Sequence, residues 1–104
     1  MATIRKDFDS YKIWQYSGHK YEAVVYCFHD NTRVGELIFH KEGIKPPQNR
    51  LQSDKPVIHF PISRFNDIIS ILRHEKPLCL FLNLDKHIGM VATSNHEPIG
   101  EEES

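Results

Sequence analysis

Aromatic and cationic side chains alternate along the first strong strand pattern of the chain. Lys12, Trp14 and Tyr16 occupy every second position of one segment, and Lys20 and Tyr21 open the next. Aromatic rings stack on nucleobases with little regard to their sequence, and nearby cations attract phosphates. These residues favour a surface for single-stranded nucleic acid, with the rings as stacking platforms and the lysines as phosphate contacts.

A basic segment of 15 residues, 41–55, supplies further cations. It contains Gly43, Pro46 and Pro47, and a connection of this length without structure of its own is usually functional or mobile. We add Lys45 and Arg50 from this segment to the candidate phosphate contacts.

Residue patterns that specify a reaction are missing from the sequence. The seven histidines are dispersed without zinc-site spacing, and the glycines form no phosphate-binding loop. Cys27 near His29 or His40 would suggest a thiol nucleophile, but a packed strand cysteine explains it more simply. We therefore expect no enzyme, no metal site and no cofactor.

Hydrophobic periodicity predicts a single α+β domain in which six strands accompany one helix, in the order β-β-β-β-α-β-β. The predicted strands are 11–16, 21–29, 34–40, 57–60, 78–84 and 88–93. The predicted helix, 63–74, has Ser63 as its N-cap and an apolar stripe of Phe65, Ile68, Ile69 and Leu72. One helix covers one face of an antiparallel sheet, so the other face must meet a second subunit, a ligand or water.

The first three strands form a meander whose faces follow from turn counting. A two-residue loop at Gly18 and His19 places Ile13 beside Val24, and Val24 beside Phe39. The core face then holds Tyr11, Ile13, Val24, Tyr26, Phe28, Leu37 and Phe39. The opposite, mixed face holds Lys12, Trp14, Tyr16, Tyr21, Ala23, Val25, Cys27, His29, Glu36, Ile38 and His40.

The mixed face has two interpretations. Trp14, Val25 and Ile38 together would expose more apolar surface than monomers usually show, which favours a homodimer interface. The aromatic and cationic side chains favour a nucleic-acid surface instead. Both hold if a dimer buries the centre and leaves the strand edges and loops for the nucleic acid.

Composition is typical of one small globular domain, with 104 residues, 39% hydrophobic and 26% charged. We place the domain at 1–96 and an acidic C-terminal tail at 97–104. Residues 1–96 have a net charge of +3, because four of the fourteen acids lie in that tail. The chain has no membrane-length apolar stretch and two cysteines far apart in sequence, so we expect a cytoplasmic protein without a structural disulfide or a membrane partner.

The junction between the fourth strand and the helix resembles a known fold. Its residues are Val57-Ile58-His59-Phe60-Pro61-Ile62-Ser63-Arg64-Phe65-Asn66-Asp67-Ile68. It is similar to the strand-to-helix junction of the single-stranded-DNA-binding transcriptional regulator fold of the positive-cofactor-four coactivators and the Whirly proteins. Two further segments, 72–77 and 97–103, look like a small group of uncharacterised cyanobacterial proteins given that fold.

The resemblance implies a homodimer of antiparallel sheets that binds single-stranded nucleic acid across strands and loops. The chain departs from that pattern in its few strand lysines, of which Lys12 is the clearest, and in its acidic tail. Our first hypothesis is a weak, non-sequence-specific single-stranded nucleic-acid-binding dimer. The alternative is a non-catalytic protein–protein interaction module that has the fold without nucleic-acid binding.

Overall fold

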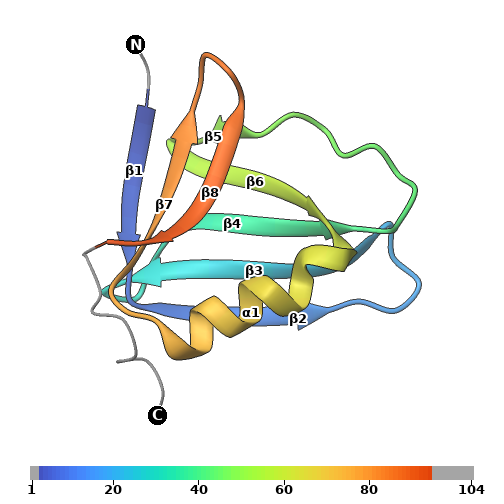
Figure 1. Cartoon of the computed structure of the whole chain (residues 1–104), viewed down its shortest axis with the longest axis horizontal. Coiled ribbons are helices and arrows are strands. Elements are labelled where there is room, and N and C mark those ends of the chain that lie inside the picture. Colours follow the sequence, from blue (N-terminus) through green and yellow to red (C-terminus); the bar gives the residue numbers. More distant parts are fainter. Residues whose placement is uncertain (1–2, 95–104) are drawn as a thin grey trace.

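The computed structural model of the chain describes residues 3–94. Eight strands and one helix, which opens with a 3₁₀ turn, make up the domain (Figure 1). The strands are β1 (Thr3–Phe8), β2 (Ser10–Gln15), β3 (Tyr21–His29), β4 (Thr32–His40), β5 (Arg50–Gln52), β6 (Lys55–Pro61), β7 (Leu78–Asn83) and β8 (Ile88–Thr93). The 3₁₀ turn is Ile62–Arg64 and α1 is Phe65–His74.

The larger sheet has five strands in the order β2-β3-β4-β6-β5 and is mixed, because β4 and β6 run parallel. The prediction of one antiparallel sheet was therefore wrong. Residues 41–49 carry the chain back along the sheet before β5 and β6 pair with each other. Pro46 and Pro47 have no N–H to give to a ladder, which keeps this return segment outside the sheet.

A second sheet has three strands in the order β1-β7-β8. β1 was absent from the prediction because its residues are mostly polar and only Phe8 is buried. β7 supplies the apolar surface against which β1 pairs, from Thr3 opposite Asn83 to Phe8 opposite Leu78. As predicted, the central strand β7 is apolar on both sides, and Leu78, Cys79, Leu80 and Leu82 are buried.

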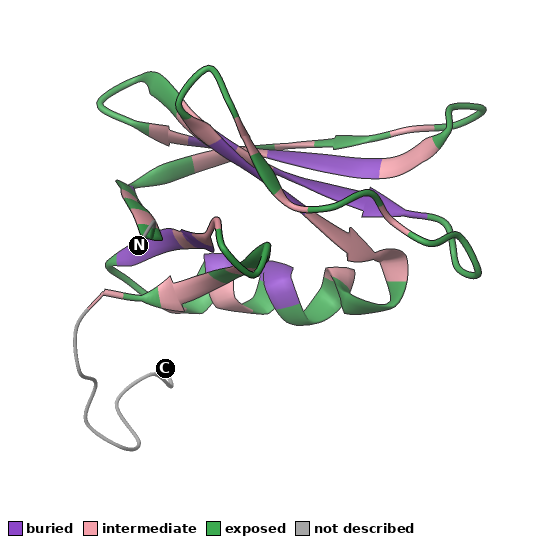
Figure 2. Cartoon of the chain, turned by 90° about the horizontal axis from the view of Figure 1, so that it is seen from above, coloured by how far each residue is buried: buried purple, intermediate pink, exposed green. Residues whose placement is uncertain are grey.

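The main core lies between one face of the five-stranded sheet and the layer formed by α1 and the three-stranded sheet (Figure 2). The predicted helical stripe is confirmed, because Ile68, Ile69 and Leu72 are buried and Phe65 meets Phe39 edge to face with 5.0 Å between ring centroids. Ser63 is not the N-cap, since it lies inside the 3₁₀ turn. Its N–H donates instead to Glu42 Oε2 at 3.0 Å.

The predicted register of β3 was wrong by one residue. Ile13 lies opposite Val25, and Val24 lies opposite Ile38. Two features cause the shift. The β2–β3 connection is longer than two residues, since the Tyr16 N–H donates to the Glu22 carbonyl across it. Asp30 and Asn31 form the two-residue β3–β4 turn, and an irregularity between Cys27 and Phe28 then moves the rest of β3 by one residue against β4. The shift places Ala23, Val25 and Cys27 in the core and moves Val24, Tyr26 and Phe28 to the opposite face.

Both cysteines are buried and free, as expected for packed strand residues. Burial raises the pKa of the Cys27 thiol to about 12, so this thiol is a poor nucleophile. The acidic segment 97–104 lies outside the described residues. Within the described part of the chain, no helix is long and apolar enough to cross a membrane.

Candidate functional site

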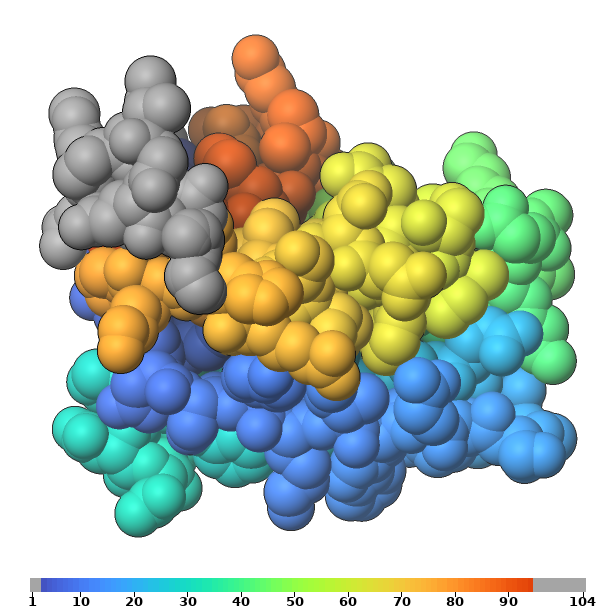
Figure 3. All heavy atoms as spheres, turned by 60° about the horizontal axis from the view of Figure 1, so that its bottom comes forward, coloured from blue at the N-terminus to red at the C-terminus, as the bar shows by residue number. Residues whose placement is uncertain are grey.

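The five-stranded sheet has a second face, turned away from α1, which we call the outer face. Strand register assigns its members, since residues directly opposite each other share a face. They include Lys12, Trp14, Tyr21, Val24, Tyr26, Phe28, Glu36, Ile38, His40, Arg50, Gln52, Lys55, Val57 and His59. Figure 3 shows the β2 edge of this sheet (blue) running beside the helix, with the β3–β4 turn (cyan) at one end and residues near 20 at the other.

A small apolar cluster forms the floor of the outer face. Val24, Ile38 and Val57 are buried beneath Tyr16, Tyr21 and Tyr26. The apolar patch that motivated the dimer interpretation is therefore largely covered, and Val25 lies in the main core instead. Trp14 is the large apolar side chain that stays open on this face, with 46% of its surface exposed.

Aromatic and imidazole rings form a continuous row across this floor. Each ring meets the next at a centroid distance between 4.4 and 6.4 Å, and the Tyr16–His19 pair is stacked. In order, the row consists of Tyr26, Trp14, Tyr16, His19, Tyr21, His40 and His59. Such a row offers successive platforms for flat ligands.

A shallow groove of about 470 Å³ opens at the Trp14 end of the row. Its lining combines three aromatic rings, three cations and one hydroxyl, from Lys12, Trp14, Tyr26, Phe28, Thr32, Arg33 and Lys55. The Arg33 guanidinium lies 5.3 Å from the centre of the Tyr26 ring. Among the described residues no carboxylate lines this groove, so it is both aromatic and positively charged.

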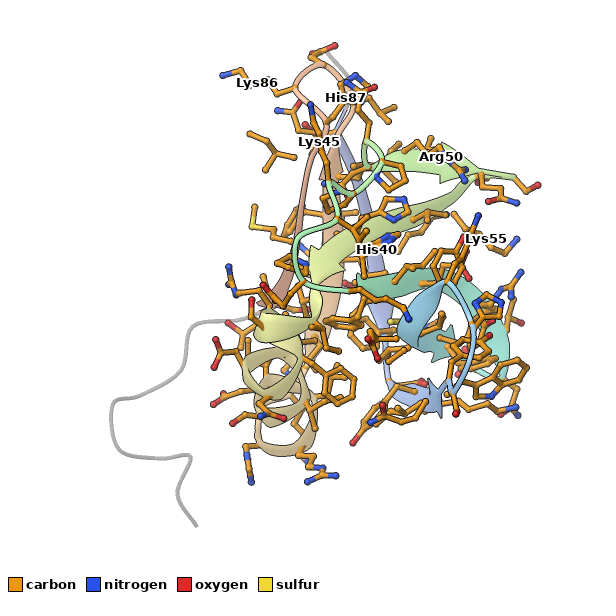
Figure 4. The ribbon with its side chains drawn as sticks, turned by 90° about the vertical axis from the view of Figure 1, so that its right-hand side faces the viewer. His40, Lys45, Arg50, Lys55, Lys86 and His87 are labelled. Atoms are coloured by element: carbon orange, nitrogen blue, oxygen red, sulfur yellow. The ribbon has the colours of Figure 1, made fainter. Side chains whose placement is uncertain are left out.

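The structure brings several of the predicted site residues together. Lys12 and Trp14 line the groove, Tyr16 and Tyr21 belong to the ring row, and the Lys20 ammonium lies 5.4 Å from the centre of the Tyr21 ring. Figure 4 shows Arg50 on the side of the sheet away from the helix. Lys45 belongs to the return segment 41–49 and is not among the residues that line the groove.

Five residues that line the groove were not among the predicted site residues, namely Tyr26, Phe28, Thr32, Arg33 and Lys55. Tyr26 and Phe28 were assigned to the core by the register error. The Asp30-Asn31 turn alone does not reveal the place of Tyr26, because a regular ladder from that turn would leave Tyr26 on the core face. The irregularity between Cys27 and Phe28 and the longer β2–β3 connection place it outside.

A pair of histidines, the buried His40 and the half-buried His59, closes the other end of the ring row. His40 Nε2 and His59 Nδ1 are 2.8 Å apart, and the His59 backbone N–H donates to Asn49 Oδ1 at 2.7 Å. Burial lowers the pKa of both rings, and the neighbouring His40 and Arg50 help to bring that of His59 to about 4. Both imidazoles are neutral near pH 7, which suits a shared hydrogen bond.

Glu36 is a carboxylate on the central strand of the outer face. It pairs in register with Tyr26 on one side and Val57 on the other. The pKa of Tyr26 is raised by burial first and then by the nearby Tyr16 and Glu36. Within the described residues Glu36 has no salt bridge, so its charge works against an anionic ligand on this face.

Two other features lie outside this face. His29 Nδ1 is 3.5 Å from Asp9 and its Nε2 is 3.6 Å from Asp30, so one ring bridges two exposed carboxylates. A hollow of about 860 Å³ separates the start of β2 from the end of α1, and its rim mixes Arg73 and Lys76 with Asp9 and Glu75. Neither combines aromatic rings with charge of a single sign.

Comparison with known proteins leaves the site to be interpreted from its own chemistry. No family model, curated protein or solved structure matches this chain. The resemblance to the single-stranded-DNA-binding regulator fold therefore stays a prediction.

Proposed function

We propose that the domain binds single-stranded nucleic acid, without strong sequence preference, across the outer face of the five-stranded sheet. The observation that carries the proposal is the ring row from Tyr26 and Trp14 to Tyr21, bordered by cations at the Trp14 end. Stacking needs a base whose faces are free, which a single strand offers and a duplex does not.

The cations support the same ligand. Lys12, Arg33 and Lys55 line the groove, while Lys20 lies over Tyr21 farther along the row. A nucleic-acid backbone that follows the ring row would pass from the three cations of the groove to Lys20. Contacts of this kind release counterions from the strand, so binding must weaken as salt rises.

The binding is expected to be weak. Glu36 places a negative charge in the middle of the outer face, and the protein as a whole has a net charge of −1. A dense basic surface of the kind that binds strands tightly is therefore missing from this face. Affinity must come mainly from stacking on the rings, which tolerates different bases.

A second candidate function, a protein contact with another copy of the chain, is favoured by β8. This strand lies at the edge of the three-stranded sheet, has no charged residue, and exposes Ile88 and Met90 at 55% and 49%. Edge strands without charge or proline tend to pair with another strand. The homodimer would then form through β8 and leave the outer face open.

The proposed function is tested by anisotropy titrations of a labelled 20-nucleotide single strand and its duplex at low and moderate salt. The single strand should bind saturably, more tightly than the duplex, and more weakly as salt rises. Equal binding of both forms would point to a nonspecific charge effect and would overturn stacking on the outer face.

The β8 contact is tested separately by light scattering across micromolar concentrations. Wild type should form a dimer that the Met90→Lys variant cannot form, because a lysine at the edge opposes strand pairing. If the wild type stays monomeric at every concentration, the β8 contact is refuted, and the nucleic-acid proposal is unaffected.

A further inference from the structure

The groove beside Trp14 lies at one end of the outer face, where three connections of the sheet meet. β2 and β6 begin there, and the β3–β4 turn closes the same end, since β4 and β6 run parallel. Each connection contributes one cation to the groove, respectively Lys12, Lys55 and Arg33. Three positive charges from three parts of the chain therefore surround one small space.

A set of carboxylates lies just beyond these cations. Asp9 and Asp30 precede Lys12 and Arg33 by three residues, and Asp54 immediately precedes Lys55. The Asp30 and Asp54 side chains are 85% and 82% exposed. Lys6 Nζ lies 3.6 Å from Asp54 and offsets one of the three charges. A nucleic-acid backbone that continued past the groove would still meet a net negative charge, whereas one that ends in the groove would not reach it.

The number of cations matches a strand end better than an internal linkage. An internal phosphodiester has one negative charge. A terminal phosphate monoester has a second ionisation near pH 6 and a charge close to −2 at neutral pH. Three cations with no carboxylate in the lining are suited to the more highly charged group.

The dimensions and lining of the groove agree with a single nucleotide. Its volume of about 470 Å³ falls in the lower part of the range of small-ligand sites. Trp14, Tyr26 and Phe28 provide an aromatic wall for one base, and the Thr32 hydroxyl is available as a hydrogen-bond donor. The ring row leads away from this wall toward Tyr16, which gives the rest of the strand its path.

We propose that the groove binds the phosphorylated end of a single strand, with the terminal base against Trp14 and the phosphate between Lys12, Arg33 and Lys55. This inference rests on the proposed function, because it names which part of the strand the outer face recognises. It goes beyond that function by assigning a terminal phosphate, at either the 5′ or the 3′ end, as the preferred ligand.

The test compares one octanucleotide in three forms, with a 5′-phosphate, with a 3′-phosphate and with neither, in competition against a labelled strand. One phosphorylated form should bind about tenfold more tightly than the unphosphorylated form, the gain expected of an added charge-assisted contact. The form that gains identifies the strand polarity. Equal affinity of all three forms would overturn the inference while leaving strand binding intact.

Charge-removing variants locate the effect. Arg33→Met and Lys55→Met keep an apolar side chain and remove the charge, so each should reduce the preference for the phosphorylated form toward one. The control is Lys76→Ala, which removes an exposed cation that follows α1 and does not line the groove, and which should keep the full preference. A preference that survives in both groove variants would contradict the assigned site.

Mononucleotides separate this inference from the proposed function. Deoxycytidine monophosphate should quench Trp14 emission at concentrations where deoxycytidine does not. If the monophosphate binds and no oligonucleotide does, the groove is supported as a phosphate-binding site and the proposal of strand binding is contradicted. Oligonucleotides could also bind with the same affinity whether or not their ends are phosphorylated, and the monophosphate no better than the nucleoside. That result would support the proposed function and contradict the end-binding site.

Discussion

Trp14 and Tyr26 meet edge to face on neighbouring strands, with 5.2 Å between ring centroids and an interplanar angle of 78°. This contact fixes the indole in place, yet 46% of the Trp14 surface stays exposed. A ring that is already ordered loses little side-chain entropy when a ligand stacks on it. The pair is therefore the position on the outer face where we expect a base to stack most favourably.

Removing the Trp14 ring should weaken strand binding. Trp14→Ala is expected to cost about 1 to 3 kcal/mol, the usual value of one base–aromatic stack. Isothermal titration with a single-stranded oligonucleotide measures the loss. Ile88→Ala is the matched control, because it removes an exposed apolar side chain from the other sheet. Unchanged affinity of the Trp14 variant would remove the stacking site from the outer face.

The groove cations should appear in the salt dependence. For single strands, the slope of log K against log salt falls by about 0.7 for each phosphate contact that is lost. The double variant Arg33→Met/Lys55→Met should therefore have a slope shallower by about 1.4 than that of wild type. Lys76→Ala should keep the wild-type slope, and a double variant that also keeps it would exclude these two cations as phosphate contacts.

Glu36 should oppose binding through its charge. Glu36→Gln keeps the size of the side chain and removes a negative charge that faces the same surface as Tyr26. We expect affinity to rise a few-fold at low salt and to converge on wild type at high salt, because screening removes the repulsion. Weaker binding of this variant at low salt would assign Glu36 a direct contact with the ligand instead.

The sequence predicted the parts of this site that depend on local pattern. Alternation in β2 placed Lys12 and Trp14 together, and helical spacing placed Ile68, Ile69 and Leu72 in the core. The assignment of Tyr26 failed because the register of β3 depends on the length of the β2–β3 connection and on the irregularity between Cys27 and Phe28, and a shift of one residue exchanges the two faces.

Long-range pairing was beyond the reach of sequence periodicity. The parallel contact of β4 with β6 brings Lys55 to the groove, and it depends on the path of residues 41–49 rather than on any local pattern. β1 likewise forms only because β7 offers it a partner. Both features arise from tertiary contacts that a single sequence does not encode locally.

The hydrogen-bonded pair of His40 and His59 predicts acid sensitivity of the fold. The pKa of His59 is about 4 in the folded protein and near 6.5 when unfolded, so the unfolded chain binds the proton more readily. The stability from this group is complete above pH 6.5 and is lost as pH falls toward 4. We expect a loss of about 1 to 3 kcal/mol over that range, since part of the ring is solvated.

Denaturant unfolding at several pH values tests this expectation. The His59→Gln variant should be less stable than wild type near pH 7 and should lose less stability between pH 6.5 and 4. His74→Gln, which replaces an exposed histidine at the end of α1, serves as the control for a histidine-to-glutamine change outside the His40–His59 pair. Parallel curves for His59→Gln and wild type would show that His59 titrates normally.

Trp14 emission during a single-strand titration tests the central proposal most directly, because Trp14 is the sole tryptophan of the chain and lies in the proposed site. We expect saturable quenching that follows the anisotropy of the labelled strand and weakens with salt. Strand binding without any change in Trp14 emission would contradict it, as would the absence of binding at low salt.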